Sequence, residues 1–242
     1  MRRLSRNDLE AIATRVVNAY MKLPEFEGDE IYRIDPEILC RSLLRLTLDY
    51  RNLTCDGSIL GLTSFEGTGV TVYDEGGNEE IYLLDGKTIL IESALWEDIT
   101  QLGRRNFTVT HEASHQVLKM LFPMDYGRKP HENRAVQIHC CRSEPFRRGM
   151  IRDWEEWQTN ALASAILLPQ GLVEKAMHLF GVKDKIRVLN KLFAKDDYER
   201  FVNMTELLGC SKTALAIRMM QLGYIGKNYL DNPYRMLDVE VD

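Results

Sequence analysis

Residues 107–121 read FTVTHEASHQVLKML and contain the pattern His-Glu-x-x-His at His111, Glu112 and His115. Apolar residues recur here at helical spacing and Pro123 lies just beyond, which predicts a helix. Side chains four residues apart lie on one face of a helix, so the two imidazoles can bind one metal ion. Glu112 is turned about a quarter-circle away, where it can hold a reacting water molecule instead of the metal. The motif therefore predicts a metal site that needs a third protein ligand.

A second helix, predicted over residues 153–169, supplies the candidates for that ligand. It is apolar nearly all round after its first turn, which is typical of a buried helix. Glu156 would point its carboxylate toward the same neighbour as several small residues, and a buried carboxylate is costly unless it is paired or bound to a metal. Glu155 and Asp153 are the alternatives, although the helix dipole already explains acids at those positions. The two-His-one-Glu set of many zinc peptidases favours Glu156. The small residues are Ala161, Ala163, Ser164 and Ala165.

Together, the two segments resemble the ImmA/IrrE family of metallo-endopeptidases. The family pattern is H-E-x-x-H, then E-x-x-A-N-x-F-A-x-x-L-L-M-P, then a helical tail, and the resemblance spans roughly residues 100–225. Phe107-Thr108 fits the Phe-Thr that usually precedes the first element. The departures concern packing positions and leave the ligands and the base in place. The second element is matched by Glu156, Asn160, Ala163, Leu167 and Pro169, and the departures in it are Thr159, Leu162, Ile166 and Leu168.

This resemblance implies a zinc-dependent endopeptidase that cleaves a cytoplasmic protein, such as a helix-turn-helix transcriptional repressor. One Zn²⁺ ion, or another divalent metal, would be bound by His111, His115 and Glu156. Glu112 would act as the general base and then the general acid. Help at the oxyanion usually comes from a His, Tyr or Arg side chain, and the sequence does not choose among the candidates. These candidates are Tyr126, His131, His139 and the arginines of residues 122–150.

The segments around the motif predict an α+β, zincin-like fold over residues 1–180. Residues 1–45 are expected to form helices, one from Ser5 to about Met21 and a second that starts at Asp35-Pro36-Glu37. Residues 46–93 are expected to form a small, mostly antiparallel sheet, and residues 94–180 carry the catalytic helices. Gly76-Gly77 marks a turn, and Asp85-Gly86 predicts a two-residue hairpin. An extended peptide would bind as an added strand at a sheet edge near Thr88–Ile91.

Residues 181–242 predict a helical, helix-turn-helix-like region. Its two helices would span residues 201–208 and 212–222, joined by Gly209-Cys210-Ser211. This pattern offers a rival function, a DNA-binding regulator whose metal site senses or stabilises. The net charge of −1 over residues 196–225 opposes that function, because a duplex reader needs a basic face. A further alternative is a non-catalytic scaffold with a structural metal.

Composition limits the remaining classes of protein. The chain of 242 residues has a formal net charge of −5, which disfavours a general nucleic-acid binder. Its five cysteines are odd in number and lack C-x-x-C spacing, so free thiols in a reducing compartment are expected. Neither a signal peptide nor a membrane span is recognised, so a cytoplasmic protein that does not bind membranes is expected. His139-Cys140-Cys141 is not favoured as a second metal site, because adjacent cysteines rarely converge on one ion.

Overall fold

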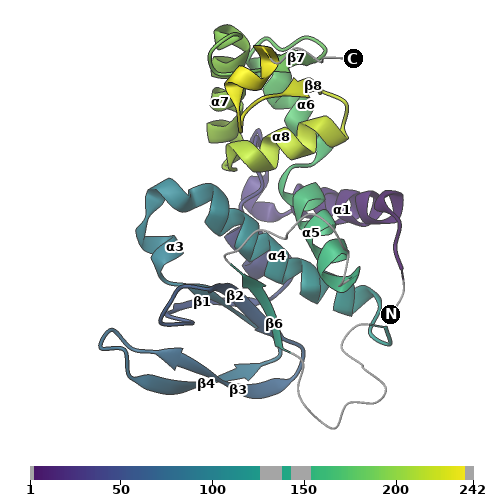
Figure 1. Cartoon of the computed structure of the whole chain (residues 1–242). Helices are drawn as coiled ribbons and strands as arrows, with labels where there is room; N and C mark the ends of the chain where they lie inside the picture. The colour runs from purple at the N-terminus through teal and green to yellow at the C-terminus, as the bar shows by residue number, and fades with distance from the viewer. Residues whose placement is uncertain (1–2, 126–137, 143–153, 238–242) are drawn as a thin grey trace. The chain divides into compact units, whose positions relative to one another are not determined.

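The computed structural model describes residues 3–125, 138–142 and 154–237 of the chain. The chain forms two compact units, each shown in Figure 1. Unit 1 consists of Met1–Asp29 and Asp35–Leu167, and unit 2 consists of Glu30–Ile34 and Leu168–Asp242. Helices and small sheets occur in both units, so the fold is mixed α+β, as the sequence predicts.

The two predicted N-terminal helices are confirmed, together with their capping residues. Ser5 caps α1 (Arg6–Tyr20): its hydroxyl accepts the Asp8 amide hydrogen, and the Asp8 carboxylate accepts the Ser5 amide hydrogen at 2.8 Å. Asp35 caps α2 (Pro36–Ile38), which continues into a single wide turn. These local signals work because each cap satisfies backbone N–H groups that the first helical turn leaves unpaired. The short turns are η1 (Pro24–Phe26) and η2 (Leu39–Leu43).

A four-stranded mixed sheet with strand order β1-β5-β2-β6 forms the base of unit 1. β5 pairs in parallel with β1, whereas β2 is antiparallel to both β5 and β6. Every residue of β5 is buried, as expected for an apolar run inside a sheet. The prediction of a peptide-binding edge near Thr88–Ile91 is therefore wrong, because both edges of β5 are already paired. The strands are β1 (Thr47–Arg51), β2 (Ile59–Ser64), β5 (Thr88–Glu92) and β6 (Ile138–Arg142).

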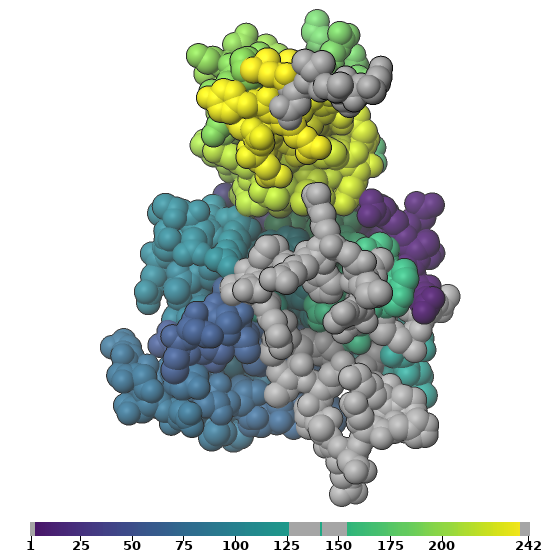
Figure 2. All heavy atoms as spheres, viewed as in Figure 1, coloured from purple at the N-terminus to yellow at the C-terminus, as the bar shows by residue number. Residues whose placement is uncertain are grey.

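An antiparallel hairpin of β3 (Gly67–Tyr73) and β4 (Glu79–Asp85) forms the blue rim of unit 1 in Figure 2. It turns at Gly76-Gly77, as predicted, where Gly77 has φ +79°. The predicted hairpin at Asp85-Gly86 is wrong, because β4 pairs with β3 while β5 pairs with β1 and β2. The turn at Asp85-Gly86 instead leads the chain from one sheet into the other. The Asp85 carboxylate accepts hydrogen bonds there from the backbone N–H of Lys87 and the hydroxyl of Thr88.

The predicted motif helix is α4 (Leu102–Leu121), which contacts β2, β5, β6 and a second helix, α5 (Trp154–Leu167) (Figure 1). Gly61 of β2 lets α4 come close, since a Cβ there would lie 2.7 Å from Thr108 Cγ2 and 2.9 Å from Glu112 Cγ. The Gln116 side-chain amide also donates to the Thr63 hydroxyl, at 2.8 Å. α4 is thus fixed against the sheet at two points. Before it come α3 (Ala94–Glu97) and η3 (Ile99–Gln101).

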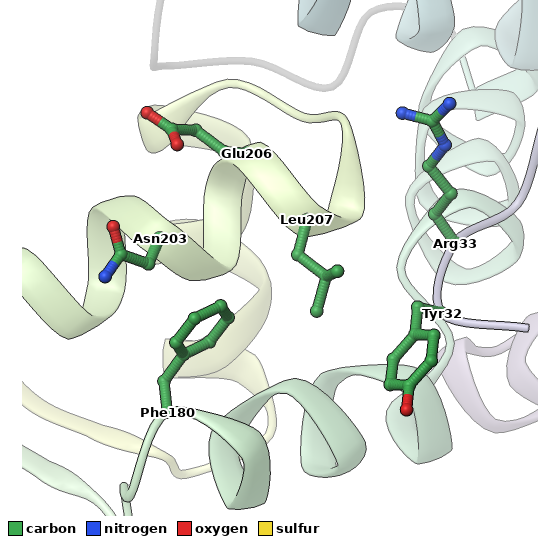
Figure 3. Close-up of a pocket in the computed structure, with 6 residues that line it drawn as sticks. All are labelled: Tyr32, Arg33, Phe180, Asn203, Glu206 and Leu207. Atoms are coloured by element: carbon green, nitrogen blue, oxygen red, sulfur yellow. The ribbon is translucent and has the colours of Figure 1, made fainter.

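Unit 2 contains the predicted helix-turn-helix, with α7 ending at Gly209 in the left-handed conformation and α8 capped by Ser211. The expectation of a purely helical region is incomplete, because β7 and β8 form a parallel pair. A cavity of about 630 Å³ is lined by aromatic, apolar and polar side chains, among them Phe180, Leu207 and Arg33 (Figure 3). The elements are α6 (Gln170–Leu179), β7 (Ile186–Leu189), α7 (Lys195–Leu208), α8 (Lys212–Gln221), β8 (Ile225–Asn228) and η4 (Pro233–Leu237). Among the described helices of the chain, none has the length and apolar character needed to cross a membrane.

Candidate metal centre

Three side chains from α4 and α5 converge inside unit 1. The Glu156 carboxylate lies 3.3 Å from His111 Nε2 and 3.4 Å from His115 Nε2, and the two Nε2 atoms are 3.2 Å apart. Ligand atoms about 2.0–2.2 Å from a tetrahedral zinc ion stand roughly 3.3–3.6 Å from one another. The observed separations fit that spacing. His111, His115 and Glu156 thus form a group that can hold a metal ion.

Neighbouring side chains orient the two imidazoles so that Nε2 of each ring is the acceptor. The Asn160 amide donates to the Glu156 backbone carbonyl at 2.9 Å, which turns its Oδ1 toward His111 Nδ1 at 3.2 Å. The Thr159 hydroxyl donates to the Glu155 carbonyl at 2.9 Å, so its oxygen can accept from His115 Nδ1 at 3.3 Å. With the proton held on each Nδ1, both Nε2 lone pairs face the carboxylate. This is the usual support for metal-binding histidines.

Burial differs among the three side chains of the group. The side chains of His111 and His115 are 2% and 0% exposed, whereas that of Glu156 is 24% exposed. Burial alone would raise the pKa of Glu156, but in the metal-free protein hydrogen bonds from the two histidines, when these also carry a proton on Nε2, hold that pKa well below its usual range. For His111, burial acts to lower the pKa, and the Glu156 and Glu112 carboxylates raise it overall. The carboxylate therefore stays ionised, as a metal ligand must be.

Glu112 lies beside the group in full burial. Its Oε1 accepts the Cys141 backbone N–H at 3.0 Å, and its Oε2 has no hydrogen-bond partner among the described residues. Burial is the main cause that raises its pKa to about 8; the Glu156 charge also raises it, while His111 and the Cys141 N–H lower it. A carboxyl group in this state can give or take a proton near neutral pH. Its second oxygen is left available for a water molecule.

Cys141 offers an alternative grouping, because its thiol lies near both His111 and Glu112. Burial, followed by the charge of Glu112, raises the pKa of this thiol to about 12. A thiol must lose its proton to bind a metal, so the two histidines and Glu156 form the better site. The side chains of His139 and Cys140 lie outside the described residues, so the prediction about a second metal site at residues 139–141 stays a prediction.

No family model and no curated protein matches this sequence. The site must therefore be judged on its own residues. Its buried imidazoles, their oriented tautomers and the ionised acid each suit a bound divalent cation.

The structure describes only some of the other residues that the sequence offers as metal ligands or oxyanion contacts. Tyr126, His131 and Asp153 lie outside the described residues. The backbone of His139 is on β6, opposite Thr63, and its side chain also lies outside what is described. Within the described residues, the convergent acid is Glu156 and not Glu155.

Sequence reasoning missed the residues that support the ligands. Thr159 and Asn160 follow Glu156 by three and four positions, which is the spacing of neighbours on one helix face. That spacing is a signal in the sequence from which their supporting role could be predicted. Gly61 and the Cys141 amide gave no such signal, because their roles depend on strands that are distant in sequence.

Proposed function

We propose that this chain is a zinc-dependent endopeptidase of the ImmA/IrrE kind, with a zincin-like arrangement of its motif helix and sheet. The observation that carries the proposal is the convergence of His111, His115 and Glu156 at separations of 3.2–3.4 Å, beside the buried Glu112. Structural zinc sites are closed by four protein ligands, whereas catalytic ones keep an open position. The three ligands found among the described residues therefore favour catalysis. Zinc suits the two imidazoles best, and other divalent metals are alternatives.

The chain's own residues supply the rest of the chemistry. A bound zinc ion lowers the pKa of water and polarises the scissile carbonyl. Glu112 would accept a proton from the attacking water and return it to the leaving amine. Asn160 and Thr159 fix the imidazole rings, so little reorganisation is needed when the reaction begins.

The proposed substrate is a cytoplasmic protein such as a helix-turn-helix repressor. This part rests on the resemblance of the H-E-x-x-H segment and the α5 segment to the peptidase family. Cleavage of such a repressor would relieve repression of the genes that it controls.

The rival reading as a DNA-binding regulator is weakened by α8, which would be the recognition helix. Its described cations are Lys212 and Arg218. Arg218 is only 2% exposed, and its Nε donates to the Leu168 carbonyl at 2.9 Å. A buried guanidinium cannot contact DNA phosphates, so α8 presents too little positive charge for duplex binding.

The decisive experiment compares the parent with Glu112→Gln and with Glu155→Gln as a matched control on α5. Each protein is incubated with the helix-turn-helix repressor encoded nearest to its gene, with and without a chelator, and its zinc content is measured. We expect the parent to cleave and the chelator to stop it. Glu112→Gln should keep its zinc and lose about 10²–10⁴-fold in rate, the usual contribution of a general base. Glu155→Gln should cleave like the parent.

Two results would contradict the proposal. Equal rates for Glu112→Gln and the parent would remove Glu112 from its role. Full zinc occupancy without cleavage, by the parent, of this repressor or of a generic unfolded protein would favour the non-catalytic scaffold.

A further inference from the structure

A second set of metal-binding atoms overlaps the candidate metal centre. The ligand atoms of His111, Glu112 and Cys141 all lie within 4.8 Å of one another, and we call these three residues the sulfur set. His111 also belongs to the His-His-Glu set, which His115 and Glu156 complete. The sulfur set offers one imidazole, one carboxylate and one thiol. Because thiolate ligands select soft cations, the two sets suit different metals.

The pairing of β6 with β2 explains how a cysteine reaches the motif helix. Cys141 lies opposite Gly61 of β2, and side chains at opposite positions of an antiparallel pair lie on the same face of the sheet. That face is the one covered by α4, since a Cβ on Gly61 would lie 2.9 Å from Glu112 Cγ. The backbone N–H of Cys141 also donates to Glu112 Oε1 at 3.0 Å. The thiol therefore lies on the α4 side of the sheet, next to Glu112.

The sulfur set contains a buried polar atom that needs a partner. The Glu112 side chain is completely buried, and its Oε2 has no hydrogen-bond partner among the described residues. A buried charged group is costly unless it is paired or bound to a metal. The carboxylate of Glu112 and a thiolate of Cys141 together carry two negative charges, which match one divalent cation. Cys141 is partly exposed, so a cation can reach its thiol from solvent.

The proton on the Cys141 thiol must be removed before the sulfur can bind a metal. A coordinating cation deprotonates a thiol outright: the S–H bond breaks, a sulfur–metal bond forms, and the proton passes to solvent water. A soft cation gains more from the sulfur bond than zinc does. The cost of removing the proton therefore selects for soft cations. Cd²⁺ has the same charge as Zn²⁺ but is larger and softer, which makes it the appropriate probe.

We propose that a soft divalent cation such as Cd²⁺ binds to the sulfur set, at a position distinct from that of an ion in the His-His-Glu set. Asn160 holds the proton on His111 Nδ1, so both sets draw on the single Nε2 lone pair of His111. The two ions therefore exclude each other. The soft cation also coordinates Glu112. On the proposed function, on which this consequence rests, it removes the general base together with the zinc ion.

The test adds CdCl₂ to the metal-free, full-length chain and records cadmium K-edge X-ray absorption and the ultraviolet sulfur-to-cadmium charge-transfer band. We expect one Cd²⁺ ion per chain with a sulfur atom in its first shell, and loss of the band in Cys141→Ser. This variant should bind Cd²⁺ about tenfold less tightly or worse. Its zinc affinity should not change, which also shows that it is folded. Cys55→Ser, which removes an exposed thiol, should behave like the parent.

Two further variants separate the two ligand sets. Glu112→Gln should weaken the binding of Cd²⁺ and leave that of zinc unchanged, whereas Glu156→Ala should weaken zinc binding and keep the cadmium–sulfur band. Cd²⁺ added to the zinc-loaded parent should release zinc to a chromogenic indicator, and Cys141→Ser should release less at the same Cd²⁺ concentration.

A cadmium first shell without sulfur would overturn the proposal. An equally strong band in Cys141→Ser, or one zinc and one cadmium ion bound together at the two sets of one chain, would overturn it as well. None of these measurements depends on cleavage. Failure of this proposal is therefore distinguishable from failure of the proposed peptidase activity.

Discussion

Replacing Gly61 by alanine should disturb the face of α4 that carries Glu112 while leaving His111 and His115 in place. The added methyl would meet Thr108 Cγ2 at 2.7 Å and Glu112 Cγ at 2.9 Å, well inside the usual contact distance of about 3.5–4.0 Å. Such overpacking costs about 1–3 kcal/mol. Loss of glycine entropy in the unfolded chain returns about 0.4–1 kcal/mol. The midpoints of the two ranges leave a net destabilisation of about 1 kcal/mol.

Denaturant unfolding of the metal-free proteins measures this change. Gly67→Ala on β3 is the matched control, since its methyl would lie 3.6 Å from the Leu84 carbonyl oxygen, an ordinary contact. It should change stability by less than about 0.5 kcal/mol. Adding Thr108→Ser to Gly61→Ala removes the Cγ2 atom and should restore part of the loss. A Gly61→Ala protein as stable as the parent would refute the close approach of α4 to β2.

Two further outcomes follow from the site. Thr159→Val and Asn160→Ala should each weaken zinc binding about 10–100-fold, as loss of a ligand's hydrogen-bond partner usually does, measured by competition with a chromogenic chelator. Burial raises the pKa of Glu112 to about 8 in the folded, metal-free protein. The contribution of this carboxyl group to the free energy of unfolding is therefore complete below its unfolded pKa and is lost as pH rises through 8. The stability of metal-free Glu112→Gln should consequently increase relative to that of the parent between about pH 5 and about 8. Unfolding curves recorded across this pH range with a chelator present measure the difference in free energy of unfolding. A difference that does not change with pH would contradict the burial argument.

Features set by neighbours in sequence could be predicted from the sequence. Ser5 with Asp8, and Asp35 before Pro36, cap their helices through contacts within one turn. The spacing of His111 and His115 on one helix face is local in the same sense. The prediction of Glu156 over Glu155 required more: the cost of a carboxylate on a buried helix, the helix dipole that already explains Glu155, and the two-His-one-Glu pattern of zinc peptidases.

Features set by strand order could not be predicted in this way. The dipeptide Asp85-Gly86 has the chemistry of a tight turn whether or not its flanking strands pair with each other. The apolar sequence of β5 predicts its continuous burial. The identity of the neighbouring strands, however, depends on contacts with residues that are dozens of positions away in the sequence. The β7–β8 pair is only four residues long on each strand, too short for a reliable alternation signal.

Zinc K-edge X-ray absorption of the loaded protein tests most directly whether His111, His115 and Glu156 bind one ion. We expect a first shell of nitrogen and oxygen only, at about 2.0–2.2 Å, with imidazole scattering from two rings. One equivalent of zinc should bind to the parent, and His115→Ala or Glu156→Ala should lower the affinity steeply, while Glu112→Gln keeps the spectrum of the parent. A sulfur shell at about 2.3 Å, which would implicate Cys141, or an unchanged spectrum in Glu156→Ala, would contradict this assignment.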